Sequence, residues 1–162
     1  MKMNKEKLGN VAELANRGRR RLKKDERQPG KYPYCGAGGV IEYVNTFTHD
    51  GDFLLLAAVG NGLGAKKKTS YLMKGKFHAG TNVHVLKLSE SVDPDYIMFF
   101  LNWTDLKPFA HGVAMLALPS SVISTIPIKL PTLSEQRKVV KKIESSKESD
   151  RNSLMDEIFE GM

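Results

Sequence analysis

The first ninety residues or so alternate short apolar stretches with turn residues, a pattern that predicts a mostly β region. Val40–Val44 and Tyr71–Met73 are typical of short strands, and Val83–Leu88 alternates apolar and polar side chains as a half-buried edge strand does. The run Phe53–Val59 is apolar throughout and is followed by glycines, which predicts a strand buried on both faces. At Leu8–Leu14 we expect a short strand or turn.

The hydrophobic period changes after residue 92, where the sequence predicts a helix. Asp93 is a suitable N-cap, Pro94 suits the first helical position, and the apolar stretch Tyr96–Leu101 follows. We expect this helix to pack on the sheet. Residues 112–128 return to short irregular segments, and Leu130-Pro131 closes the globular part.

The C-terminal stretch is predicted to form one long helix. Thr132 and Glu135 fit a capping box, and no glycine or proline interrupts the chain before Gly161. A helix from about residue 133 to residue 160 would be about 40 Å long and would project from the domain. Its seam is polar in the middle, at Lys147 and Asp150. The apolar seam positions are Val140, Ile143, Leu154 and Ile158.

These elements predict an α+β fold class with two parts. A globular domain of short curved strands and a few helices is expected over residues 1–131, and the long helix, for dimerisation or subunit docking, over residues 132–162. A chain of 162 residues with 41% apolar content has room for one sizeable core.

The charge balance favours a polyanionic partner. The formal net charge is +7, which makes nucleic acid the leading partner class and an acidic protein the second. The excess is local, with six cations in the eight residues Arg17–Lys24 and a second cluster at Lys66, Lys67 and Lys68. The single cysteine, Cys35, agrees with a reducing cytoplasm, and with no apolar run of membrane-spanning length we expect a soluble cytoplasmic protein.

Two motifs suggest catalysis, but neither fits its chemistry. Only three residues separate Gly60 from Gly64 and an alanine follows, whereas a phosphate-binding P-loop needs four residues and then Lys and Ser/Thr. Asp93–Tyr96 is similar to the Asp-Pro-Pro-Tyr signature of adenine methyltransferases, but Asp95 replaces the second proline and no glycine-rich cofactor loop is present. We therefore expect no catalytic residues and no cofactor.

The four histidines, His49, His78, His84 and His111, are scattered, without the close spacing of metal ligands on one helix or strand. We therefore expect no metal site.

The segment Ile126–Val140, read as IPIKLPTLSEQRKVV, resembles the signature at which a recognition domain of type I restriction-modification specificity (S) subunits ends and a long helix begins. Further segments resemble the family in the same order, so that the similarity spans nearly the whole chain: Leu8–Leu14, Tyr32–Ile41, Phe53–Gly64 and Asp95–Leu101. Gly112–Met115 departs from the family, because it lacks the glutamine common there.

The resemblance implies a non-catalytic protein that selects a DNA site. Family S subunits hold two recognition domains joined by antiparallel helices, each reading one part of a split site, and this chain is similar to one half of such a subunit. The implied partners are double-stranded DNA, a modification (methyltransferase) subunit, through it a restriction subunit, and a second copy of the chain paired through the C-terminal helix. Paired with itself, the chain would read an interrupted palindrome whose half-sites lie about one helical turn apart, whereas pairing with a different S-like chain would give two unrelated half-sites.

We expect the cations to contact phosphates and a smaller polar set to contact bases. The predicted phosphate contacts are Arg17, Arg19, Arg20, Arg21, Lys66, Lys67 and Lys68. The predicted base contacts, chosen by residue type, are Tyr32, Tyr34, Asn61, Asn82 and His84. The alternative is an interaction module or inactive specificity cassette that docks through its helix and no longer reads DNA. Salt-dependent DNA binding separates the two.

Overall fold

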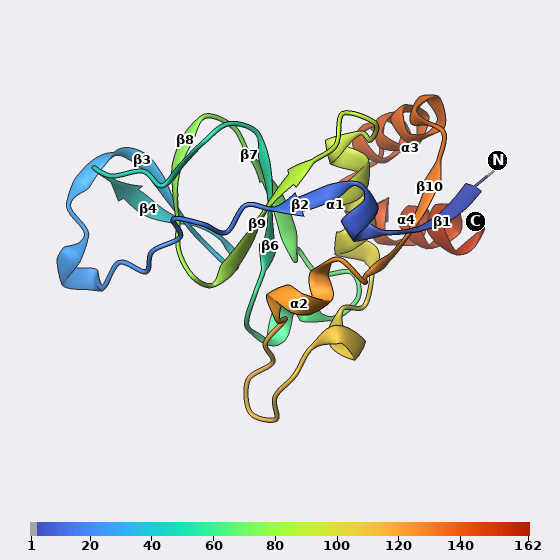
Figure 1. Cartoon of the computed structure of the whole chain (residues 1–162). Coiled ribbons are helices and arrows are strands. Elements are labelled where there is room, and N and C mark those ends of the chain that lie inside the picture. Colours follow the sequence, from blue (N-terminus) through green and yellow to red (C-terminus); the bar gives the residue numbers. More distant parts are fainter. Residues whose placement is uncertain (1–2) are drawn as a thin grey trace.

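Three sheets and four α-helices make up the protein in the computed structural model, which describes residues 3–162 (Figure 1). The strands are β1 (Met3–Lys7), β2 (Ala12–Leu14), β3 (Pro29–Gly36), β4 (Gly39–Val44), β5 (His49–Asp50), β6 (Phe53–Ala57), β7 (Ser70–Met73), β8 (Lys76–Ala79), β9 (Val83–Leu88) and β10 (Pro127–Pro131). The helices are α1 (Pro94–Trp103), α2 (Ser120–Ile123), α3 (Leu133–Ser145) and α4 (Arg151–Glu160). The α+β class predicted from the sequence is confirmed.

The central sheet is antiparallel and has the strand order β2-β9-β6-β7. The prediction that β6 is buried on both faces is confirmed, because Leu54 and Leu56 belong to the core on the helix side and Leu55 to the core on the other side. The prediction that β9 is an edge strand is wrong. It lies between β2 and β6, and its polar residue His84 is buried by loop packing at one end of the sheet.

A second sheet, of order β4-β3-β8-β5, packs on the face of the central sheet away from α1 (Figure 1, left). Phe77 and Cys35 of this sheet meet Leu55 and Tyr71 of the central sheet in the smaller core. The Tyr71 hydroxyl donates to the Gly36 carbonyl over 2.6 Å and so ties the two sheets together. Burial raises the pKa of the Cys35 thiol to about 11, so it is protonated at neutral pH and acts as a packing residue.

Helix α1 covers the other face of the central sheet, as the sequence predicts. The Asp93 carboxylate accepts from the Tyr96 N–H over 3.1 Å, and Pro94 is the first helical residue. At the far end of the helix the Asn102 side-chain oxygen accepts from the Ser70 N–H over 2.8 Å, which fixes α1 to β7.

The C-terminal region is helical, but it is two helices and not one. Thr132 caps α3 as predicted, with its hydroxyl accepting from the Glu135 N–H over 3.3 Å. Helix α3 ends at Ser145, because the next residue, Ser146, is extended and its hydroxyl bonds back to the Ile143 carbonyl over 2.6 Å. Such bonds from a serine compete with continuation of a helix.

Helix α4 folds back on α1 and does not project. Phe159 is fully buried, and its ring packs edge-on against Phe100 and tilted against Trp103, at 5.2 Å and 5.3 Å between ring centroids. Burial of a phenylalanine is worth about 1.5–3 kcal/mol before such ring contacts are counted. That gain favours two short packed helices over one exposed helix.

The helices share one core with the rest of the domain, so packing is continuous across the predicted boundary between residues 131 and 132. Strand β1 pairs antiparallel with β10, directly before α3, and this places the first described residues beside the helices. Among residues 3–162, no helix has both the length and the apolar character needed to cross a membrane.

Candidate nucleic-acid interface

One end of the central sheet gathers loops that are far apart in sequence. Antiparallel pairing of β6 with β9 places the chain after Ala57 beside the turn that contains Asn82, and the Ala58 N–H donates to the Asn82 carbonyl over 2.8 Å. The Gly60 N–H donates to the Leu116 carbonyl over 2.9 Å, which joins a third loop to these two. We call this region the loop end; in Figure 1 its loops after β6 and before α2 lie at the lower side, and the segment after β2 runs from there toward the second sheet at the left. It comprises residues 16–24, 58–64, 81–82 and 111–117.

His84 is buried beneath the loop end and connects two of its parts. Its Nε2 donates to the Leu118 carbonyl over 2.6 Å, and its Nδ1 lies 3.1 Å from the side-chain nitrogen of Asn16. Because the Asn16 oxygen accepts from the Val85 N–H over 2.8 Å, the Asn16 amide nitrogen faces His84 and Nδ1 accepts from it. Burial, and then the charge of Arg19, lower the His84 pKa, so the imidazole is neutral. His84 was predicted to contact a base, but it lies inside and positions the loops.

The basic segment Arg17–Lys24 runs along the loop end with most of its cations in solvent. Arg17, Arg20 and Arg21 are exposed, and the Arg20 guanidinium meets the Glu26 carboxylate at 3.0 Å. Arg19 differs, because its guanidinium turns inward and donates to the Val83 carbonyl over 2.8 Å. Burial lowers the Arg19 pKa. The structure therefore leaves three of the four predicted arginines available to a polyanion and uses the fourth to hold the segment on the sheet.

Two more histidines and a tyrosine fix the same segment. His49 donates to the Ala15 carbonyl over 2.6 Å, and His78 donates to the Arg20 carbonyl over 2.9 Å. The Tyr34 hydroxyl accepts from the Leu22 N–H over 3.0 Å. Tyr34 is only 3% exposed, so this predicted base contact also lies inside. A tyrosine can contact a base or form a hydrogen bond inside the protein, and the bond to the Leu22 N–H gives Tyr34 the internal role.

The other predicted base contacts lie in different places. Asn82 is exposed in the turn between β8 and β9, within the loop end. The backbone of Asn61 belongs to the glycine-rich turn there, while its side chain lies outside what the structure describes. Tyr32 is half-buried on the second sheet, where its ring lies tilted against Phe47, with 5.1 Å between the ring centroids, and Lys31 lies over it. Of the five predicted residues, only Asn82 is an exposed side chain in the described loop end.

The lysine cluster lies apart from the arginines, near α1 and α4. The Lys66 ammonium pairs with the Asp156 carboxylate at 2.6 Å, and the Lys67 N–H donates to the Asn102 carbonyl over 3.1 Å. The Lys68 ammonium sits 5.9 Å from the centre of the Tyr71 ring. The two cationic clusters that the sequence predicts to act together therefore flank different parts of the fold.

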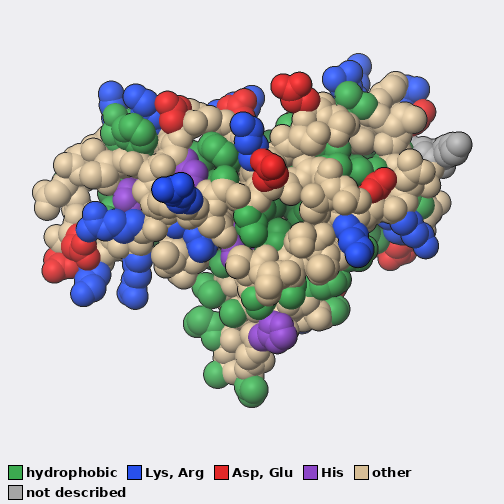
Figure 2. Space-filling model, viewed as in Figure 1, with side chains coloured by type: hydrophobic (Ala, Val, Ile, Leu, Met, Phe, Trp, Pro, Cys, Tyr) green, Lys and Arg blue, Asp and Glu red, His purple; other side chains and the backbone are tan. Residues whose placement is uncertain are grey.

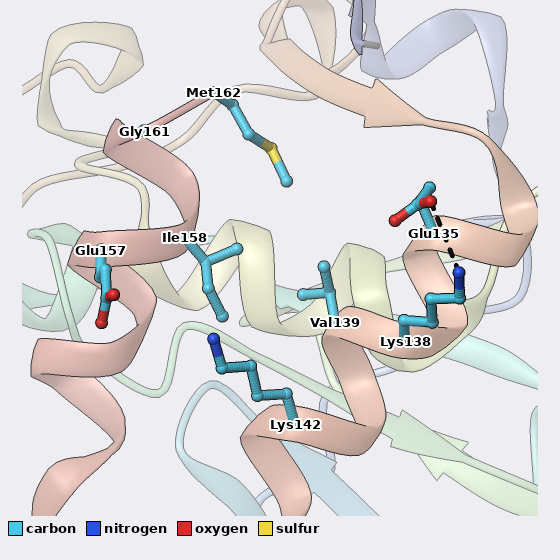
Figure 3. A pocket seen from close by; sticks show the side chains of 8 residues that line it. All are labelled: Glu135, Lys138, Val139, Lys142, Glu157, Ile158, Gly161 and Met162. Atoms are coloured by element: carbon cyan, nitrogen blue, oxygen red, sulfur yellow. Dashed lines mark ion pairs between the residues drawn. The ribbon is translucent and has the colours of Figure 1, made fainter. Parts of the chain in front are cut away.

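The predicted helix-interface residues pack against this chain's own core. Val140 and Ile143 are buried in it, and Leu154 and Ile158 are half-buried at its margin. A groove of about 390 Å³ lies between α3 and α4. Figure 3 shows that Val139 and Ile158 line it, with charged side chains around it. Folding α4 back thus places most of the seam inside the chain.

Sequence reasoning missed the hairpin of residues 111–117, which it assigned to irregular structure. Its tip exposes Val113 completely and Met115 by 64%. Figure 2 shows apolar side chains gathered on the lower protrusion of the molecule, where this hairpin lies, and Lys and Arg side chains gathered to its left. Apolar residues flanked by Gly112 and Pro119, with no periodicity, were the only available signal.

The described residues 3–162 contain no group of three or more His, Cys, Asp or Glu side chains arranged to hold a metal ion. The buried histidines instead use both ring nitrogens in hydrogen bonds within the protein. The region is thus a set of positioned loops with exposed cations.

The fold is that of a small α+β domain with loops held together at one end, and comparison with known families identifies its kind. The chain belongs to the family of type I restriction modification DNA specificity domains, whose model matches residues 2–153. A putative type I restriction enzyme specificity subunit from Haemophilus influenzae is 32% identical over 134 residues, which are 83% of this chain and 34% of that protein. The specificity subunit of the type I restriction enzyme EcoprrI from Escherichia coli is 26% identical over 105 residues, 65% of this chain and 25% of that protein. The chain thus spans about a third or less of the length of these relatives.

Solved structures share the fold at low sequence identity. The S subunit of a type I restriction-modification system from M. genitalium superimposes with a TM-score of 0.70 at 17% identity, over 89% of this chain and 38% of that chain. The HsdS subunit from Thermoanaerobacter tengcongensis gives a TM-score of 0.54 at 16% identity, over 98% and 45%. A chain from a structural study of complex assembly in the type I R-M system gives 0.65 at 14% identity, over 95% and 41%. The comparison shows a common fold.

Proposed function

We propose that this chain recognises a DNA sequence through its loop end, as a non-catalytic specificity module of a type I restriction-modification system in the cytoplasm. Methyl transfer and cleavage belong to separate modification and restriction subunits that the module directs to the site. The observation that carries this proposal is the loop end of a DNA specificity domain, where exposed arginines lie beside an exposed polar turn and a protruding hairpin.

Phosphates and bases are read by different parts of this surface. Arg17, Arg20 and Arg21 supply charge that neutralises phosphates and fixes the module on the duplex. Asn82 supplies a donor and an acceptor that suit the edge of adenine in the major groove. Buried side chains such as His84 hold these groups in place, so the DNA meets a preformed surface.

Fluorescence anisotropy with a random-sequence duplex, measured over a range of salt concentrations, tests the proposal. Replacing Arg17, Arg20 and Arg21 together by Ala is expected to weaken binding and to reduce the salt slope by about 2.7, because each lost phosphate contact removes about 0.9. The matched control replaces Lys66, Lys67 and Lys68 by Ala, which removes the same charge elsewhere and should change the slope less. Equal slopes for the two triple variants would contradict the assignment of DNA binding to the loop end. If the wild-type chain shows no salt-dependent binding, it is an interaction module or inactive cassette.

We further propose that two such domains read a bipartite site, and that a second copy of the chain supplies the second domain. A two-fold pair reads the same short sequence on opposite strands, so DNA selected by the pair should be an interrupted palindrome. The expected spacing of about one turn depended on a helix of about 40 Å, and α3, with 13 residues, is only about 20 Å long. Light scattering gives the oligomeric state, and an asymmetric selected site contradicts self-pairing.

The face formed by α3 and α4 is the surface we propose for the modification subunit. Exposed Lys138, Lys142 and Glu157 surround the groove drawn in Figure 3, and this face is formed by the helices, away from the loop end. Reversing the charge of Lys138 and Lys142 to Glu should weaken binding to a purified modification subunit and leave the salt slope of DNA binding unchanged. A variant that binds this subunit as tightly as the parent chain removes this face from the interface.

A further inference from the structure

The hairpin of residues 111–117 is held rigidly at its base. His111 and Ala117 exchange two backbone hydrogen bonds of 2.8 Å, and the Leu118 N–H donates to the Ala58 carbonyl over 2.7 Å. The His84 imidazole holds the Leu118 carbonyl from inside the sheet. Movement of the tip relative to the central sheet would break these bonds, so its side chains are presented in a fixed direction.

The turn itself is built around Gly112. This residue has a φ of +115°, and a β-carbon there would collide with the Met115 carbonyl, so only glycine fits. At the apex the Val113 side chain is fully exposed and that of Met115 is 64% exposed. Scattered exposed apolar residues are common, but two at the apex of a fixed protruding turn form a shape that a partner can use.

Duplex DNA fits this tip better than a protein surface does. A stable protein interface buries about 800 Å² on each partner, which a narrow tip with two apolar side chains does not offer. A wedge that unstacks a DNA base step needs only one or two apolar side chains. The basic segment is held at the same end of the central sheet, because Arg19 donates to the Val83 carbonyl over 2.8 Å and the Arg20 N–H donates to the Ala79 carbonyl over 3.0 Å. Figure 2 shows Lys and Arg side chains to the left of the protrusion, where they would hold the duplex beside it.

We infer that the hairpin inserts Val113 and Met115 against a base step of the bound duplex, partly unstacks it and kinks the DNA. This inference rests on the proposed function and adds a second way of reading sequence. The energy of the kink depends on the step that is opened, and pyrimidine–purine steps open most easily. The chain therefore discriminates among sequences at a step with which it makes no base hydrogen bond.

The test uses duplexes of about 30 base pairs, selected by the wild-type chain from a random library and carrying 2-aminopurine at successive positions. Binding of wild-type protein should raise the fluorescence several-fold at one step, because unstacking relieves its quenching. The double variant Val113→Thr/Met115→Gln keeps the size of both side chains and makes them polar. It should lose the fluorescence rise and about tenfold in affinity, with an unchanged salt slope because no cation is removed.

The control is Ile41→Ala, which truncates an exposed apolar side chain on β4 outside the loop end and should retain the rise. Urea unfolding of both variants checks that they fold. Tight wild-type binding without a rise at any position overturns the wedge and leaves DNA recognition standing. A double variant that gives the full rise, or that loses only its binding to the modification subunit, overturns it as well. Absence of any salt-dependent binding by the wild-type chain refutes both the wedge and the proposed function.

Discussion

Replacing His84 by Leu removes the two hydrogen bonds that connect the start of the basic segment to the base of the hairpin, and it keeps a buried side chain of similar size. The change leaves the Leu118 carbonyl and the Asn16 amide nitrogen without their partner. An unsatisfied buried polar group costs about 1–3 kcal/mol. The full cost applies to the carbonyl, and less applies to Asn16, which is half-buried and reaches water. We expect the free energy of unfolding to fall by about 2–4 kcal/mol.

The same site predicts how stability depends on pH. Burial lowers the pKa values of His84 and His78 below the unfolded value of about 6.5, so the unfolded chain binds more protons in that range. The stabilisation is therefore complete above about pH 6.5 and is lost as the pH falls toward the folded pKa values. Protonation of His84 would also set an N–H against the Asn16 amide N–H.

Urea unfolding followed by the fluorescence of Trp103, the single tryptophan, measures both effects. Wild-type protein should be less stable at about pH 5 than at about pH 7.5, and His84→Leu should show a smaller difference because one titrating group is gone. Equal stability of the wild-type chain at the two pH values, or an unchanged pH difference in the variant, would refute the assignment of a neutral, buried His84.

Three further changes test other parts of the structure. Phe159→Ala should lower the free energy of unfolding, measured with urea, by about 3–5 kcal/mol. Glu157→Ala, on the exposed face of the same helix, should change it little. If the helix projected into solvent, both variants would be as stable as the parent chain. Gly112→Ala should speed hydrogen exchange of the hairpin amides, because alanine is strained at its positive φ; unchanged exchange would show that the turn does not need glycine. Lys66→Ala should barely alter the salt slope of DNA binding, because Lys66 lies beside Asp156 of α4, away from the loop end. A slope as low as that of the arginine variant would place Lys66 in the interface.

Local sequence signals predicted the elements whose stability is local. The apolar run of β6, the Asp93 cap of α1 and the Thr132 cap of α3 all occur where the sequence placed them. The continuity of the last helix was mispredicted because no glycine or proline marks its break. The polar middle of the predicted seam, around Lys147, was the signal of a break, since a surface that alternates apolar ends with a polar centre packs better once it is folded in two.

The site was harder to predict because residue type does not report burial. Tyr34, His84 and Arg19 have the chemistry of DNA contacts, and each uses it to bond the protein's own backbone. These bonds join residues 12 to 64 positions apart, so no local pattern reveals them. Val113 was overlooked for the opposite reason, because an apolar residue in an irregular segment gives no hint that it stands at the apex of a fixed turn.

The buried side chains that hold the loop end and the exposed side chains that we propose to contact DNA are different residues. The groups that hold the loop end together, His84, Asn16 and the Leu118 carbonyl, are linked through one another, so a change in one disturbs the others. Asn82 and Val113 reach solvent, and substitutions at exposed positions usually alter stability by less than about 0.5 kcal/mol. On the proposed function, substitutions at these exposed residues should therefore change the preferred DNA sequence while the buried hydrogen bonds that hold the loop end stay intact.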